Sequence, residues 1–136
     1  MHVWSAWSGI YSCSVFTMYE EEAWRGSLDL QWDDTGRVTG SGRLNTGEDF
    51  ITEDEGKEPQ LMDVVFLGQI VQRGNLYGIM VAPNRFEKGI CWTLDLEVNI
   101  EQKELAGEVF YSEDYLGEGE PGSISIKYER RSEKIQ

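Results

Sequence analysis

The chain has few of the residues on which many enzyme functions depend. Among its 136 residues there are one histidine, two cysteines and three prolines. The histidine is His2, at the start of the chain, so His-based triads, His-ligated zinc and imidazole acid–base catalysis lack their key residue. Cys13 and Cys91 have no metal-ligand spacing. We therefore expect two reduced thiols in or beside the core rather than a disulfide.

Long apolar runs and nucleotide-binding motifs are also missing. No run of 18 apolar residues occurs, which excludes a membrane-spanning helix. The segment Met1–Trp7 has no Lys or Arg before an apolar stretch, so we expect no secretory signal and a cytoplasmic location. No Gly-x-Ser-x-Gly elbow, Walker loop or Gly-x-Gly-x-x-Gly turn is present.

Basic residues are scarce relative to acidic ones. The chain has 12 Lys and Arg against 25 Asp and Glu, for a formal net charge of −13. Such a surface repels phosphate backbones, so direct binding to DNA or RNA is not expected. The imbalance suits a protein that presents acidic surface to a basic partner, and it equally suits simple solubility.

What the chain does have is a repeated alternation of apolar and polar residues, broken by Gly, Asp and Asn turns. In Trp24–Trp32, for example, the residues Trp24, Leu28, Leu30 and Trp32 share one face of a period-two strand. Antiparallel strands of this kind bury their apolar faces around a common core. The sequence therefore predicts an all-β fold, a single antiparallel up-and-down (meander) barrel of about eight strands, in one domain over residues 1–136 with a charged tail at 129–136.

Turn signals give the expected strand limits. The predicted strands cover about Trp7–Tyr19, Trp24–Trp32, Arg37–Leu44, Leu61–Gln72, Leu76–Ala82, Ile90–Ile100, Leu105–Tyr111 and Ser123–Tyr128. Asp33–Gly36 and Asn45–Glu48 read as turns, the former a tight hairpin in which Gly36 takes a positive φ. Gly40 and Gly42 share the inward face, and we expect a tryptophan from a neighbouring strand to fill the space beside them.

Most connections are of hairpin length, so consecutive strands should be neighbours. Closure of the first strand on the last would remove the exposed edges of such a meander. The two longer connections, residues 53–60 and 112–122, are rich in carboxylates, and we expect them to be loops.

The opening Trp7-Ser8-Gly9-Ile10-Tyr11 and the regular hairpins after it resemble the calycin barrels, the lipocalin and avidin class. Those families carry a Gly/Trp pair in the first strand, although here Trp7 precedes Gly9 whereas the lipocalin pattern runs Gly then Trp. The resemblance spans most of the chain at the level of architecture. It implies a ligand cavity at the open end of a barrel.

The aromatic residues supply a candidate pocket for a small apolar or aromatic ligand. Tryptophan and tyrosine rings could line it, with an arginine fixing the orientation of the ligand. The candidate set is Trp24, Trp32, Arg43, Tyr77, Trp92 and Tyr111. The alternative is that the tryptophans fill the barrel, since eight strands leave room for little beyond side chains.

A candidate partner-binding surface combines acidic loops with aromatic residues outside the strands, because contact surfaces are enriched in exposed aromatic side chains. Its members are Trp4, Glu53, Asp54, Glu55, Phe86, Glu113, Asp114 and Tyr115.

Paired carboxylates could in principle hydrolyse glycosides, with one acid and one ionised partner across a cleft. The candidates are Asp29, Asp63, Asp95, Glu97 and Glu108. Most alternate with apolar neighbours and should face solvent, and we expect the same of Asp63. The acidic loops lack the ligand spacing of an EF-hand, so neither a metal nor a cofactor is expected.

We therefore expect a non-enzymatic acidic barrel that acts as a protein-protein interaction module or accessory subunit. A calycin-like carrier of a small apolar ligand is the first alternative, and an acidic inhibitor that mimics nucleic acid is the second.

Overall fold

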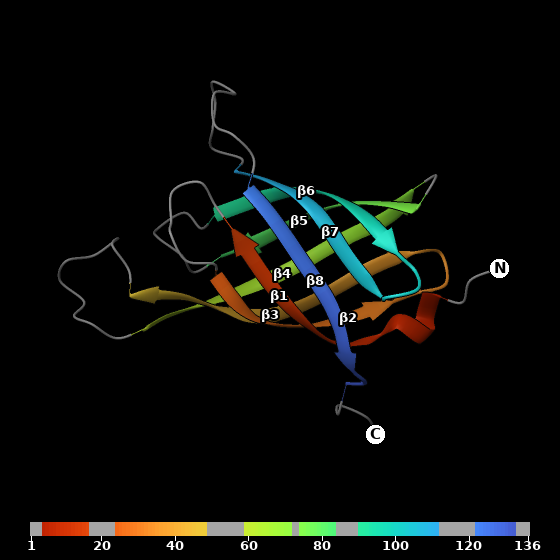
Figure 1. Cartoon of the computed structure of the whole chain (residues 1–136), viewed down its shortest axis with the longest axis horizontal. Helices are drawn as coiled ribbons and strands as arrows, with labels where there is room; N and C mark the ends of the chain where they lie inside the picture. The colour runs from red at the N-terminus through yellow and green to blue at the C-terminus, as the bar shows by residue number, and fades with distance from the viewer. Residues whose placement is uncertain are drawn as a thin grey trace.

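The computed structural model describes residues 4–16, 24–48, 59–71, 74–83, 90–111 and 122–132, with backbone alone at 46–48, 59, 60, 90 and 111. These residues form a short 3-10 helix and eight strands (Figure 1). The elements are η1 (Trp4–Trp7), β1 (Gly9–Phe16), β2 (Trp24–Trp32), β3 (Arg37–Glu48), β4 (Pro59–Val71), β5 (Asn75–Ala82), β6 (Ile90–Asn99), β7 (Glu104–Tyr111) and β8 (Gly122–Arg130).

The strands form one closed antiparallel barrel in chain order. Each strand pairs with the next, and β1 pairs with β8 to close the sheet. This is the predicted up-and-down barrel of eight strands. Closure leaves the barrel without an edge strand, which removes the unpaired backbone groups on which another chain could add a strand.

Alternation along each strand separates the filled interior from the outer wall. In β2 the side chains of Trp24, Leu28, Leu30 and Trp32 are buried, as the sequence predicted. The largest side chains that are fully buried include Tyr11 and Phe66 together with leucines from several strands. An interior of eight strands is just wide enough for such side chains, so they form a packed core.

Gly40 and Gly42 in β3 face the interior, but the prediction that a tryptophan fills the space beside them is wrong. A Cβ atom at Gly40 would lie 2.2 Å from the Asp29 carbonyl oxygen and 2.8 Å from Leu30 Cδ2. One at Gly42 would lie 2.1 Å from the Ser27 carbonyl oxygen and 2.7 Å from Leu28 Cδ2. These leucines are the register neighbours of the glycines on β2. The missing side chains therefore make room for the backbone of β2 as well as for the two leucines.

The predicted hairpin turn at Asp33–Gly36 is confirmed. Gly36 has a φ of 86° and its N–H donates to the Asp33 carbonyl at 3.0 Å. The Asp33 carboxylate accepts hydrogen bonds from the backbone N–H of Thr35 at 2.9 Å and of Arg37 at 3.1 Å. The Gly36 carbonyl in turn accepts from the Ile70 N–H at 2.8 Å, which joins the turn to β4.

Three predicted limits are wrong. Strand β4 begins at Pro59, so it includes the last two residues of the loop predicted at 53–60. Asn45–Glu48 is not a turn, because β3 continues to Glu48 and stays paired with β4, with an irregular register between Asn45 and Glu48. Strand β1 begins at Gly9 instead of about Trp7, because Trp4–Trp7 forms η1, where the Ser8 N–H donates to the Ser5 carbonyl at 3.2 Å. Strand β1 also has a register shift against β8 between Ile10 and Tyr11.

The meander gives the barrel two different ends (Figure 1). At one, β1, β3, β5 and β7 stop and β2, β4, β6 and β8 start. The four segments attached there, residues 17–23, 49–58, 84–89 and 112–121, carry thirteen of the 25 acidic residues but three of the 12 basic ones. We call this the acidic end. The opposite end carries η1 and the hairpin turns, and we call it the helical end.

Candidate functional site

The candidate pocket residues divide between the two faces of the barrel wall. Trp24, Trp32 and Trp92 are 9%, 4% and 3% exposed and belong to the core. Arg43 and Tyr77 lie on the outer face, where Tyr77 is 47% exposed. These residues therefore do not line one pocket.

Trp32 lies at the helical end, in a cluster of three tryptophans. Its ring stacks on Trp4 with centroids 5.5 Å apart and meets Trp7 at 5.2 Å. The backbone N–H of Trp32 donates to Ser8 Oγ at 2.9 Å, and the backbone N–H of Ser5 donates to the Asp34 carboxylate at 3.1 Å. Together these contacts hold η1 across this end of the barrel.

Tyr11 lies beneath this cluster. Its hydroxyl donates to the Trp7 carbonyl at 2.5 Å, and burial raises the pKa of that hydroxyl above its usual range. The Trp32 side chain opposes part of this shift. Nevertheless, the buried Trp32 Nε1 has no acceptor in hydrogen-bond geometry among the described residues. The three tryptophans are thus closely packed, and the indole N–H of Trp32 is their one buried, unsatisfied hydrogen-bond donor among the described residues.

Trp24 and Trp92 meet at the acidic end. Their rings pack edge to face with centroids 5.7 Å apart, a favoured geometry for aromatic pairs. Tyr111 is the register neighbour of Trp92 on β7, and its side chain lies outside the described residues. This pair belongs to the candidate pocket and is also part of the core.

Of the candidate partner-binding residues, the structure describes Trp4. It lies in η1, and its ring is partly buried against Trp7 and Trp32 rather than fully exposed. The others lie outside the described residues: Glu53, Asp54, Glu55, Phe86, Glu113, Asp114 and Tyr115.

The carboxylates considered for glycoside hydrolysis are all on the outer wall. Asp63 faces solvent, as predicted, and its Oδ1 accepts from Arg43 Nε at 2.7 Å in an exposed ion pair. Asp29 accepts from Gln31 at 2.9 Å and from Ser132 at 3.0 Å. Asp95 and Glu108 are exposed and directly opposite each other on β6 and β7, with Glu97 two residues further along β6.

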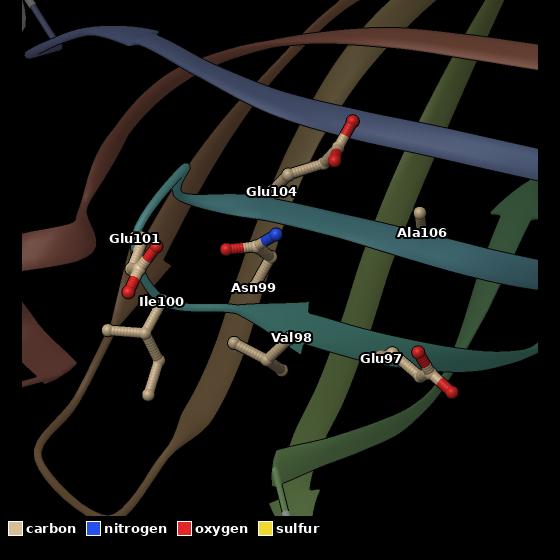
Figure 2. A pocket seen from close by; sticks show the side chains of 7 residues that line it. All are labelled: Glu97, Val98, Asn99, Ile100, Glu101, Glu104 and Ala106. Carbon is tan, nitrogen blue, oxygen red and sulfur yellow. The ribbon is translucent and has the colours of Figure 1, made fainter.

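A shallow, open hollow of about 420 Å³ lies over the turn between β6 and β7. Its lining includes Glu97, Asn99, Glu101 and Glu104, and Figure 2 shows the three carboxylates pointing apart instead of toward a common point. Asn99 Oδ1 accepts from the Gln102 N–H at 3.1 Å, and Glu104 accepts from Ser125 Oγ at 3.1 Å. In the part of the chain that the structure describes, no group of three or more His, Cys, Asp or Glu side chains could hold a metal ion.

Cys13 and Cys91 are not joined in a disulfide. Cys13 is buried in the core, and burial raises the pKa of its thiol to about 12. Cys91 is half-buried, and its register neighbour Val81 lies on the outer face of β5.

Among the described residues no helix is long and apolar enough to cross a membrane, since η1 has four residues.

One feature that the sequence analysis did not identify as a site is the set of apolar side chains on the outer wall of β4 to β7. Val65, Leu67, Tyr77 and Phe110 are each 39–47% exposed. The signal was the segment Leu61–Leu67, in which apolar residues occupy both faces of the strand instead of alternating.

Comparisons with known proteins identify no relative of this chain. No protein-family model matches the chain, and no curated protein or solved structure matches it. The chain is an eight-stranded antiparallel closed barrel.

Proposed function

We propose that this protein is a non-enzymatic interaction module that holds a basic protein partner at the acidic end of the barrel. The observation that carries the proposal is the meander topology, which attaches four acidic connections to one end. These segments hold thirteen acidic against three basic residues, a net −10 of the chain's −13. Their members include the candidate contact residues Glu53, Asp54, Glu55, Glu113 and Asp114.

Charge gathered at one end acts on a partner before contact. A surface of one sign steers a partner of the opposite sign and raises its association rate by a factor of about 10 to 1,000. The core also favours an interaction module over a carrier, because large side chains fill the barrel interior that a carried ligand would need. They include Tyr11, Phe66 and the three strand tryptophans.

The second candidate is a calycin-like carrier of a small apolar or aromatic ligand. The closed barrel is the architecture that the calycin resemblance implied, and the Trp24–Trp92 pair lies at the acidic end, near Tyr111 in the register. The third, an acidic mimic of nucleic acid, needs carboxylates spaced like phosphates along one face. The charge here is instead concentrated at one end, which favours a basic protein as the partner.

Two cysteines that are not joined in a disulfide suit a reducing compartment, and we propose the cytoplasm.

Native mass spectrometry of the protein purified from its own host separates the candidates. A stoichiometric basic protein that dissociates at high salt would support the interaction module. A co-purifying small molecule whose retention is indifferent to salt, and which is lost in Trp92→Ala, would instead support the carrier.

A further inference from the structure

Apolar side chains cover part of the outer wall of the barrel. We call this surface the wall patch and define it by its outward-facing members on β4 to β7: Val65, Leu67, Tyr77, Ile79, Val81 and Phe110. Four of them are strongly exposed, with values from 39% for Phe110 to 47% for Tyr77.

Strand register makes the wall patch continuous. Leu67 lies opposite Ile79, Ile79 opposite Thr93, and Thr93 opposite Phe110. The neighbouring row joins Val65, Val81 and Cys91 in the same way. Four adjacent strands span about 14 Å at roughly 4.8 Å per spacing. The patch is therefore one surface and not a set of scattered residues.

The sequence of the wall patch is typical of a sheet face that another element or another chain covers. Strands buried on both faces read as nearly continuous apolar runs, and Leu61–Leu67 reads that way. All eight strands lie in the barrel wall, and η1 contacts β2 at the helical end, so no described element covers β4 to β7. Because the closed barrel has no edge, a partner would have to contact this face through side chains and not by adding a strand.

Acidic side chains border the wall patch on β6 and β7. Asp95 is the register neighbour of Tyr77 on one side and of Glu108 on the other. Like charges directly opposite each other destabilise a sheet. Arg43 pairs with Asp63, whereas no basic side chain among the described residues lies within salt-bridge distance of Asp95 or Glu108. A cationic group placed here from outside would relieve the repulsion.

We propose that the wall patch is a docking surface for a protein segment, an amphipathic helix whose apolar face is flanked by Lys or Arg. The exposed apolar side chains would receive the apolar face of the helix, and Asp95 and Glu108 would receive its flanking Lys or Arg. A second copy of this chain fits less well, since a two-fold contact would bring Asp95 and Glu108 against an equally acidic surface. The proposal rests on the interaction-module function but uses a surface separate from the acidic end.

The test uses a synthetic 18-residue helical peptide with leucine at positions i, i+3, i+4 and i+7 and lysine along both borders. A matched peptide carries glutamate in place of lysine. The readout is the rate at which a maleimide modifies Cys91, the register neighbour of the wall-patch residue Val81, while buried Cys13 serves as the internal control. We expect the lysine peptide at saturation to slow Cys91 modification at least fivefold, and the glutamate peptide to have no effect.

Matched variants locate the contact. Leu67→Ser should weaken peptide binding on the order of tenfold, because it removes an apolar side chain that docking buries. Leu61→Ser is the control, since Leu61 is 59% exposed on the same face of β4 but is separated from Val65 by Asp63. Replacing Asp95 and Glu108 with Asn and Gln should reduce both affinity and its salt dependence.

Three results with the peptides and variants would overturn the proposal: no protection of Cys91, equal loss in both leucine variants, or equal protection by the glutamate peptide. Protection that grows with protein concentration in the absence of peptide would overturn it in favour of a second copy. Neutralising Glu53, Asp54 and Glu55 should leave peptide binding to the wall unchanged. Failure of the wall patch can therefore be told apart from failure of the acidic end.

Discussion

Two glycines with positive φ provide a direct test of the β2–β3 turn. Gly36 has a φ of 86° and Gly74 a φ of 76°. Alanine in this conformation costs about 1–2 kcal/mol. At Gly74 an added Cβ would meet no atom within 4 Å, so Gly74→Ala should cost that amount alone.

At Gly36 the added Cβ would lie 2.8 Å from Ile70 Cβ and 3.1 Å from Ile70 Cγ1. Overpacking of this kind costs a further 1–3 kcal/mol or so, because the backbone of β4 would have to move. Gly36→Ala should therefore lower the free energy of unfolding by about 2–5 kcal/mol. Gly36→Val should cost more, since a β-branched residue resists positive φ more strongly.

Urea denaturation of both variants, followed by circular dichroism, measures the difference. We expect Gly36→Ala to be less stable than Gly74→Ala by about 1–3 kcal/mol, which for a domain of this size corresponds to roughly 3–15 °C in Tm. Equal stabilities would refute the contact between the turn and Ile70. A Gly36→Val protein with an unchanged Tm would refute the turn itself.

Three further predictions concern charge and redox chemistry. Glu108→Lys should raise the free energy of unfolding by about 0.2–1 kcal/mol by removing its repulsion with Asp95, and a decrease in a urea titration would contradict the register. The hydrogen bond from the Thr35 side chain, followed by that from the Arg37 backbone, lowers the pKa of the Asp33 carboxyl. The stability that it contributes is present above the unfolded pKa of about 3.9 and is lost as pH falls through the lower folded value. Asp33→Asn should therefore flatten Tm against pH below about pH 4, and an unchanged profile would count against this effect. A chelator or a reductant should leave Tm unaltered, and a fall of several degrees with either would reveal a metal or a disulfide.

The sequence predicts the barrel well because its signals are local. Period-two alternation in segments such as Trp24–Trp32, with turn residues such as Gly36 between them, determines which faces pack inward. The predicted strand limits are wrong where tertiary contacts determine the local structure. Trp4–Trp7 forms a 3-10 helix because Trp4 and Trp7 pack on Trp32, 25 residues or more away in the sequence. Asn45–Glu48 stays in β3 because β4 is long enough to pair with it.

The candidate sites were less predictable. Trp24, Trp32 and Trp92 lie inward as their alternation predicted, but period two alone does not distinguish a pocket from a filled core. The outer wall patch depends on register, because Leu67 and Phe110 become part of one surface through Ile79 and Thr93 on the strands between them. That register exists once the barrel closes and cannot be read from any single strand.

Recruitment of a basic protein by the acidic end can be tested directly. The direct measurement is the association rate constant of the co-purifying protein against ionic strength, by stopped-flow fluorescence. One variant neutralises Glu53, Asp54 and Glu55 at the acidic end, and the control neutralises Glu97, Glu101 and Glu129 toward the helical end, so that the net charge changes equally. We expect the wild-type and control rates to fall steeply as the Debye length shortens to about 10 Å at 0.1 M salt. The acidic-end variant should associate about tenfold more slowly at low salt and depend weakly on salt. If it associates at the wild-type rate at low salt, the acidic end does not recruit the partner.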